Sequence, residues 1–273
     1  QLILRERKRK KLMKLLESWQ GRKVVTKREV QSLAGKLQHA ATVVRPGRCF
    51  VHRIYALTKV KGGPDHPVRL NLLAKSDLYW WTTFMESWNG VSLLWRVRSA
   101  SPDVIVYSDA SGSWGCGALT GDEWLVFQWP IFLHPLPIAH KELIPIVIAG
   151  LVWGSSWGGK VVKFYCDNQT VVEVLTKLYS HRAGIMGYLR CLVFSAAHHG
   201  FWFTAEHIPG RDNVLADAIS RNKTNLFLSQ APSSMSKVPT ELHAEISQLL
   251  CLQDPDWLCP TWRRLFSSII QKA

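Results

Sequence analysis

The chain has little that would place it in a membrane or in an oxidising compartment. Its 273 residues include only six cysteines, none in a C-x-x-C pair, so the sequence predicts buried or incidental thiols rather than a disulfide framework or a zinc site. No signal peptide is present, and the most apolar run, from Leu143 to Trp153, is too short to span a bilayer. We therefore expect an intracellular protein, cytoplasmic or nuclear, that is not secreted and has no membrane partner.

The chain also lacks an initial methionine and an internal repeat, and it begins with Gln1, so we expect a piece of a longer protein. Acidic residues are scarce, with 20 Asp and Glu against 34 Lys and Arg. The imbalance is concentrated in residues 1–100, which hold 21 basic and 6 acidic residues, whereas residues 101–221 hold 8 and 10. A basic region joined to a near-neutral one predicts contact with a polyanion. For Arg5 to Lys11 alone, a solvated or disordered tail is the alternative.

The segment from residue 102 to 221 alternates strand and helix signals, which indicates an α/β fold with a mixed sheet and flanking helices. Gly121-Asp122 predicts a tight hairpin turn, and Pro145 predicts a kink or confinement of Glu142 to the first helical turn. The expected strands are 104–108, 115–119, 124–128, 160–166 and 201–208. The expected helices are 138–153, 168–178, 184–198 and 213–221, and a further short helix is expected near 241–250.

The first 60 residues read as helical. Thr26 and Glu29 form a capping-box pattern before an apolar-periodic segment that ends at Pro46-Gly47. On this helix Gln31, Gly35 and His39 recur at a spacing of four residues. A glycine inside a helix costs about 1 kcal/mol relative to alanine. Either it allows close packing of another helix, or it admits the sugar–phosphate edge of a nucleic acid.

Between residues 58 and 101 the signals are weaker. Gly62-Gly63-Pro64 and His66-Pro67 predict a loop, and Ser76-Asp77 is a plausible start for a helix rich in aromatic residues. The aromatic side chains of this helix are interpreted as packing rather than as a surface for stacked bases. They are Trp80, Trp81, Phe84 and Trp88.

Four acidic residues provide the strongest functional signal. Asp109 and Asp167 end apolar, β-branched runs, and Glu142 and Asp217 lie near the starts of predicted helices. Each alone fits a turn or a first-turn helix charge. Together in one cleft, the four carboxylates would repel each other unless divalent cations neutralised them. Two hard cations about 4 Å apart are the usual apparatus of phosphodiester hydrolysis, so we predict two Mg²⁺ ions, for which Mn²⁺ can substitute.

This order of elements, with acids in the sequence D, E, D, D, resembles a type 1 ribonuclease H. The strings SDASGSWGCGAL, HKEL, CDNQTVVEVL and HIPGRDNVLADAISR are similar to segments of retroelement ribonucleases H. The resemblance covers Pro102 to Arg221. It implies a ribonuclease H-like five-stranded mixed sheet and hydrolysis of the RNA strand of an RNA–DNA hybrid. Asp109, Glu142, Asp167 and Asp217 would be both its catalytic residues and its metal ligands.

A second resemblance lies nearer the start of the chain. VQSLAGKLQHAATVVRPG is similar to the thumb helix of retroviral-type reverse transcriptases, which follows the minor groove of the primer–template. It implies nucleic-acid contacts for Gln31, Gly35, Lys36 and His39, although the family commonly has an aromatic residue at the last position. Thumb and nuclease together most resemble DIRS-like retrotransposons, whose polyproteins continue into a tyrosine recombinase. The expected partners are the RNA–DNA hybrid and the rest of that polyprotein.

Several polar residues have two interpretations. Ser111 and Asn168 would contact RNA 2′-hydroxyls or form turns, and Asn213 would contact substrate or cap a helix. The family usually has a His in the loop before the last acid, and Arg211 occupies that place here. Arg211 would hold the scissile phosphate, whereas His207, at the strand end, is interpreted as structural. The pair His198-His199 is expected at the surface, without a metal.

These observations predict four regions. They are a thumb-like helical region (1–60), a connection segment (61–101), the nuclease domain (102–222) and a linker or tail toward a further domain (223–273). The polymerase palm lies outside these regions, so we do not expect DNA synthesis from this chain. Two alternatives remain, an inactive nucleic-acid-binding remnant of a retroelement and a transposase or integrase of the same fold. The latter enzymes have their Glu last, whereas Glu142 is second here.

Overall fold

The structure is a computed structural model that describes residues 4–87, 101–251, 260, 264, 265 and 268. The described chain divides into two compact units, one containing residues 4–87 and the other residues 101–251. The predicted connection segment does not form a region of its own, since its described part up to residue 87 belongs to the first unit. Trp88, named above, and the sixth cysteine, Cys259, lie outside the described residues.

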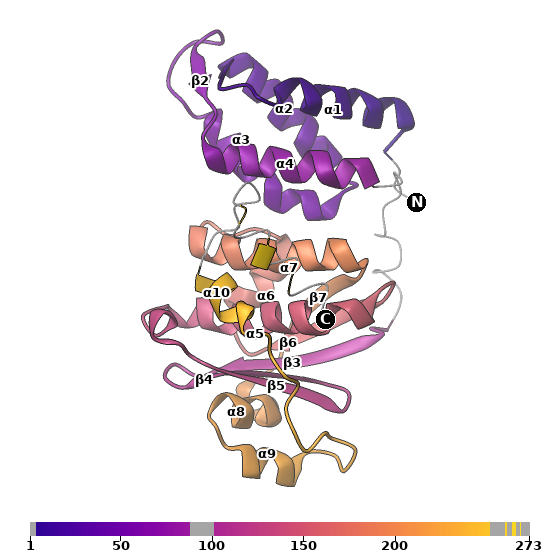
Figure 1. Cartoon of the computed structure of the whole chain (residues 1–273), viewed down its shortest axis with the longest axis vertical. Coiled ribbons are helices and arrows are strands. Elements are labelled where there is room, and N and C mark those ends of the chain that lie inside the picture. The colour runs from indigo at the N-terminus through magenta and orange to yellow at the C-terminus, as the bar shows by residue number, and fades with distance from the viewer. Residues whose placement is uncertain (1–3, 88–100, 252–259, 261–263, 266–267, 269–273) are drawn as a thin grey trace. The chain divides into compact units, whose positions relative to one another are not determined.

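The first unit is mainly helical, as the sequence predicts, and Figure 1 labels its helices and its second strand. Its described residues form four α-helices, a short 3-10 helix and a two-stranded antiparallel ribbon. The helices are α1 (Glu6–Trp19), α2 (Lys27–Ala40), α3 (His52–Leu57) and α4 (Leu72–Ser87), and the 3-10 helix is Arg45–Phe50. The strands are β1 (Val24–Thr26) and β2 (Pro67–Arg69).

The predicted capping box at the start of α2 is confirmed. The Thr26 hydroxyl accepts a hydrogen bond from the Glu29 backbone N–H (3.2 Å), and the Glu29 carboxylate accepts one from the Thr26 N–H (2.7 Å). Helix α4 begins earlier than expected, at Leu72, because the Asn71 side chain accepts a hydrogen bond from the Ala74 N–H. Residues 6–11 belong to α1, so the disordered alternative for this basic run is wrong, whereas its solvated character is confirmed because nearly all of residues 5–11 are exposed.

The aromatic residues of α4 pack inside the unit, as predicted. The ring of Trp80 stacks on Phe50 with 4.0 Å between centroids and on Phe84 with 4.9 Å, and Trp81 is fully buried. The expected loop is confirmed as far as His66, but Pro67 is not part of it, because this residue begins β2. A proline in a two-stranded ribbon is tolerated where its missing N–H faces away from the partner strand.

The second unit contains a five-stranded mixed sheet with the order β5-β4-β3-β6-β7. Strands β3, β4 and β5 are antiparallel, whereas β3, β6 and β7 are parallel. Their bounds are Val104–Ala110 (β3), Gly115–Thr120 (β4), Glu123–Gln128 (β5), Val161–Cys166 (β6) and Trp202–His207 (β7). The hairpin predicted at Gly121-Asp122 is confirmed, and Gly121 adopts the left-handed conformation (φ 56°) that a tight turn requires.

Helices cover both faces of this sheet (Figure 1). One face carries α5 (Ile138–Val152), with α6 (Gln169–Lys177) and α7 (Ala183–His199), and the other carries α8 (Val214–Ser220) and α9 (Thr224–Gln230). Helix α5 is buried along nearly its whole length. It continues through Pro145, so Glu142 is not confined to the first turn, contrary to one expectation.

The segment expected to be a linker after residue 222 is part of the second unit as far as it is described. Phe227 of α9 and Ile246 of α10 (Glu245–Cys251) are fully buried. The hydroxyl of Tyr188 in α7 donates to the Leu250 carbonyl in α10. The composition of this segment resembles a loop, but its few apolar side chains find places in the core.

Cys49, Cys116, Cys166 and Cys191 are buried and Cys251 is exposed, in agreement with the interpretation as buried or incidental thiols. Within the described part of the chain, no helix combines the length and the apolar character that crossing a membrane requires.

Candidate metal centre

The four predicted acidic residues converge at one end of the sheet. Asp109 lies in β3 and Asp167 follows β6, its parallel neighbour. Glu142 comes from α5 on one face and Asp217 from α8 on the other. Their charges interact: Asp167 and Asp217 raise the pKa of Asp109, and Asp109 and Asp167 raise that of Glu142. Elements far apart in sequence therefore bring these carboxylates into one cluster, which we call the acidic cluster.

Asp109 is held inside this cluster. Its side chain is 4% exposed, and burial, the largest cause, raises its pKa from 3.8 to about 6. The neighbouring acids add to this effect, whereas a hydrogen bond from the Ser220 hydroxyl to Asp109 Oδ2 (2.5 Å) opposes it. The ionised form of a carboxyl group at this position is energetically unfavourable without a positively charged partner.

Glu142 experiences the strongest perturbation of the cluster. It is also 4% exposed, and burial, followed by repulsion from Asp109 and Asp167, raises its pKa from 4.5 to about 9. A hydrogen bond from the Ala110 backbone opposes the shift, and the Cys166 thiol lies 3.9 Å from Glu142 Oε2. Without a cation this carboxyl group retains its proton near neutral pH.

The chemistry of these donors suits a metal ion. One donor atom each from Glu142, Cys166 and Asp167 lies within 4.8 Å of the other two, a spacing that could hold a metal ion. A bound divalent cation would reverse the cost of ionising Glu142 and Asp109, because its charge outweighs the repulsion between them. Cys166 was not predicted as part of this cluster. Its place directly before Asp167 at the strand end was the available signal.

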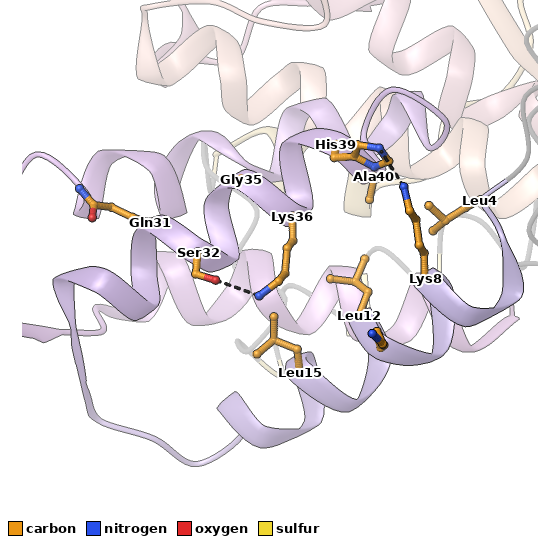
Figure 2. A pocket seen from close by; sticks show the side chains of 11 residues that line it. Leu4, Lys8, Leu12, Leu15, Gln31, Ser32, Gly35, Lys36, His39 and Ala40 are labelled. Atoms are coloured by element: carbon orange, nitrogen blue, oxygen red, sulfur yellow. Dashed lines mark hydrogen bonds between the residues drawn. The ribbon is translucent and has the colours of Figure 1, made fainter. Parts of the chain in front are cut away.

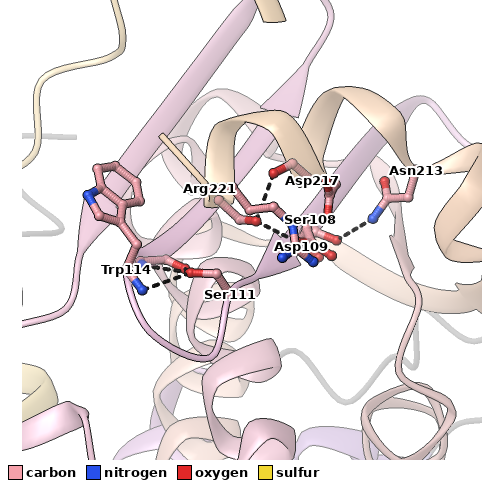
Figure 3. A network of polar contacts seen from close by, with 9 residues as sticks. Ser108, Asp109, Ser111, Trp114, Asn213, Asp217 and Arg221 are labelled. Atoms are coloured by element: carbon pink, nitrogen blue, oxygen red, sulfur yellow. Dashed lines mark hydrogen bonds and ion pairs between the residues drawn. The ribbon is translucent and has the colours of Figure 1, made fainter. Parts of the chain in front are cut away.

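The end of α8 contributes two further residues to the cluster (Figure 3). The Ser220 hydroxyl donates to Asp109, and the guanidinium Nε of Arg221 donates to Asp217 Oδ1 over 2.6 Å. Arg221 also lowers the pKa of Asp109. Neither residue was singled out from the sequence, although Arg221 follows Asp217 by four residues, the spacing at which helical ion pairs form.

Two polar residues expected near nucleic acid, Ser111 and Asn168, make structural hydrogen bonds within the protein. The Ser111 hydroxyl accepts hydrogen bonds from the Trp114 and Gly115 N–H groups and closes the β3–β4 turn (Figure 3). The Asn168 side chain caps α6. These observations favour the turn and cap alternatives left open by the sequence.

Asn213 is the N-cap residue of α8, as one alternative predicts, but its side chain makes no capping hydrogen bond and the residue is only 2% exposed. Its amide instead donates to the Ser108 carbonyl over 2.9 Å (Figure 3). Asn213 therefore ties the start of α8 to β3, beside Asp109.

The two candidates before Asp217 are both exposed but differ in their contacts. The Arg211 side chain is 86% exposed and lies 3.9 Å from Asp212, so it is free to reach a phosphate at the surface. A ring nitrogen of His207 lies 3.1 Å from the Asp167 carbonyl, which agrees with the structural interpretation of His207.

In the first unit, Gln31, Gly35, Lys36 and His39 line one groove, which has a volume of about 750 Å³ (Figure 2). The groove lies between α2 and α1. Leucine side chains of α1 form part of its apolar lining, and Lys8 and Lys11 add positive charge. A ring nitrogen of His39 lies 3.5 Å from Lys8 Nζ, and Lys36 donates to the Ser32 hydroxyl.

Gly35 has open space beside it. A methyl group placed on its α-carbon would meet no atom within 4 Å apart from its own helix. The close-packing explanation of this mid-helix glycine is therefore wrong, and Gly35 lines the open groove. No Asp or Glu lines the groove.

His199 is half-buried and its pKa is lowered, mainly by burial, so the surface placement expected for the pair holds only in part. His198 and His199 are not among the residues that could hold a metal in the described chain.

The strand order of the second unit is consistent with a ribonuclease H-like fold. No protein-family profile matches the chain, and no curated protein matches it either.

Proposed function

We propose that this protein is a metal-dependent endoribonuclease that hydrolyses the RNA strand of RNA–DNA hybrids, as part of a retrotransposon reverse transcriptase polyprotein. The observation that carries the proposal is the acidic cluster, in which carboxylates from both faces of the sheet meet at one end of β3 and β6. The resemblance to type 1 ribonucleases H supports it, as does the strand order.

Asp109, Glu142, Asp167 and Asp217 would hold two Mg²⁺ ions in this proposal. Bound there, the ions would supply an activated water and stabilise the leaving 3′ oxygen. The protein's own part is to orient its carboxylates. Ser220 and Asn213 serve this purpose, since one donates to Asp109 and the other joins α8 to β3.

The basic groove of the first unit is the proposed binding surface for the nucleic acid. Lys8, Lys11 and Lys36 would attract the phosphates, and the open space at Gly35 would admit the backbone of the duplex. Selectivity for the hybrid would come from 2′-hydroxyl contacts and from the shape of the duplex.

A gel assay with labelled RNA–DNA hybrid, double-stranded RNA and duplex DNA tests this function. We expect Mg²⁺-dependent cleavage of the RNA strand in the hybrid only, and its loss in Asp109→Asn. The matched control is Asp122→Asn, which changes an exposed aspartate in the β4–β5 turn and should cleave normally.

The other outcomes identify the alternatives. Binding of the hybrid without cleavage would support an inactive remnant of a retroelement. Cleavage or strand transfer on duplex DNA would support a transposase or integrase.

A further inference from the structure

Helix α8 carries Asp217 and Ser220 but is only seven residues long. An isolated helix shorter than about 12 residues is marginal in water, so the orientation of α8 depends on its packing. One side of it lies on the sheet: Ile219 fits over Gly117 in β4 so closely that a methyl group on this glycine would collide with it. The residues that pack against the other side of α8 therefore determine the orientation of Asp217.

The chain that follows α8 returns to cover it. Asn222 adopts the left-handed conformation (φ 60°), and the Lys223 N–H donates to the Ala218 carbonyl (2.8 Å), which ends the helix and reverses the chain. Phe227 of α9 is then fully buried, with its ring centroid 4.8 Å from that of Trp124 in β5. Phe227 and Met235 share one apolar cluster with the buried face of α8, which comprises Ala216, Ala218 and Ile219.

Hydrogen bonds fasten the following loop to the β4–β5 hairpin. The indole N–H of Trp124 donates to the Ser236 carbonyl (3.0 Å), and the Ser236 N–H donates to the Asp122 carbonyl (2.8 Å). The Thr240 N–H donates to the Trp124 carbonyl (2.7 Å). Residues 224–240, which we call the α9 segment, are thus held at both ends of the cluster that supports α8.

We infer that the α9 segment is a positioning element of the metal centre, acting through α8 on Asp217 and Ser220. The nuclease unit would then continue well past Arg221, where the resemblance ends. Phe227 is the principal positioning residue, because it is the fully buried side chain of the segment and touches the cluster at Trp124. The inference rests on the metal binding proposed for the acidic cluster, and on the proposed cleavage activity for its second readout.

The test compares full-length variants by direct Mn²⁺ titration and by the Mg²⁺ concentration that gives half-maximal hybrid cleavage. Phe227→Ala should weaken Mn²⁺ binding by about tenfold, within the range typical for loss of groups that orient metal ligands. Phe227→Leu, which refills most of the space, should recover much of the affinity. Leu249→Ala is the matched control, since Leu249 is equally part of the C-terminal chain and is 2% exposed, but lies in α10.

Thermal unfolding of each variant separates positioning from stability. Leu249→Ala should lower Tm without changing Mn²⁺ affinity, whereas Phe227→Ala should change both. If Phe227→Ala does not fold, Trp124→Phe replaces it. This substitution keeps an aromatic ring and deletes the bond to Ser236, and it should weaken Mn²⁺ binding in the same direction by a smaller factor.

Wild-type Mn²⁺ affinity in Phe227→Ala, or in Trp124→Phe where the alanine variant is unfolded, would overturn the inference. A wild-type chain that binds Mn²⁺ but cleaves no hybrid would overturn the proposed function alone, because the Mn²⁺ comparison still decides the role of Phe227. A wild-type chain that binds no Mn²⁺ would overturn both.

Discussion

Replacing Glu142 by glutamine should stabilise the metal-free protein while abolishing its proposed activity. The Glu142 carboxyl group is buried at the junction of α5 with the sheet, near Asp109 and Asp167. Glutamine keeps its shape and can accept the hydrogen bond from the Ala110 backbone, but it cannot ionise. The substitution therefore removes the charge and little else.

The magnitude follows from the pKa of Glu142, which rises from 4.5 to about 9 on folding. Between these values the unfolded chain has released this proton and the folded chain has kept it, so stability falls as pH rises through this window. At about pH 7 the loss is about 3 kcal/mol, since one pKa unit is worth about 1.4 kcal/mol. Glu142→Gln should raise the free energy of unfolding by this amount near neutral pH, and by much less at about pH 4.5.

Urea unfolding in EDTA at these two pH values measures the effect. Addition of Mg²⁺ should stabilise the wild type and have a much smaller effect on Glu142→Gln, which also should not cleave the hybrid. Glu173→Gln is the control, because Glu173 is an exposed residue of α6 paired with Lys177, and a surface change of this kind alters stability by about 0.5 kcal/mol or less.

An equal or lower free energy of unfolding for Glu142→Gln at both pH values would refute the reasoning. Such a result would mean that Glu142 is neither desolvated nor repelled by its neighbours. The acidic cluster would then not be the strained arrangement that favours a cation.

Two further substitutions test the surroundings of the two sites. Arg221→Gln removes the ion pair to Asp217 and should leave Tm nearly unchanged. It should lower the Mg²⁺ concentration for half-maximal cleavage by up to about fivefold, since an exposed ion pair is worth up to ~1 kcal/mol. An increase in this concentration would show that Arg221 supports cation binding rather than competing with it. Gly35→Ala adds a methyl group where no neighbour lies within 4 Å and should stabilise α2 by about 0.5–1 kcal/mol in thermal or urea unfolding. The same variant should weaken hybrid binding in a fluorescence anisotropy titration, and unchanged affinity would argue against a backbone contact at Gly35.

Much of the local structure was determined by the sequence alone. Three local features depend only on neighbours within a few residues: the capping box at Thr26, the cap at Asn168 and the hairpin at Gly121. The residues that predict each feature are therefore also the residues that form it. The positions of Asp109 and Asp167 at strand ends were predictable for the same reason.

The sequence pattern failed where the decisive partner lies far along the chain. Pro67 reads as a loop residue, but pairing with Thr26 makes it part of a strand. Gly35 has the same local signature whether another helix packs against it or a groove opens beside it, and only the arrangement of α1 and α2 distinguishes the two.

The metal centre also combines local features with features that depend on distant parts of the chain. The sequence by itself determined which acids were candidates, because strand and helix ends are local features. Only the tertiary structure decided that Glu142 is deeply buried beside Asp109 and Asp167, that Ser220 donates a hydrogen bond to Asp109, and that Phe227 packs in one apolar cluster with α8. Burial and contact depend on which distant segments share one core, and this choice is made by the packing of the whole unit rather than by any short stretch of residues.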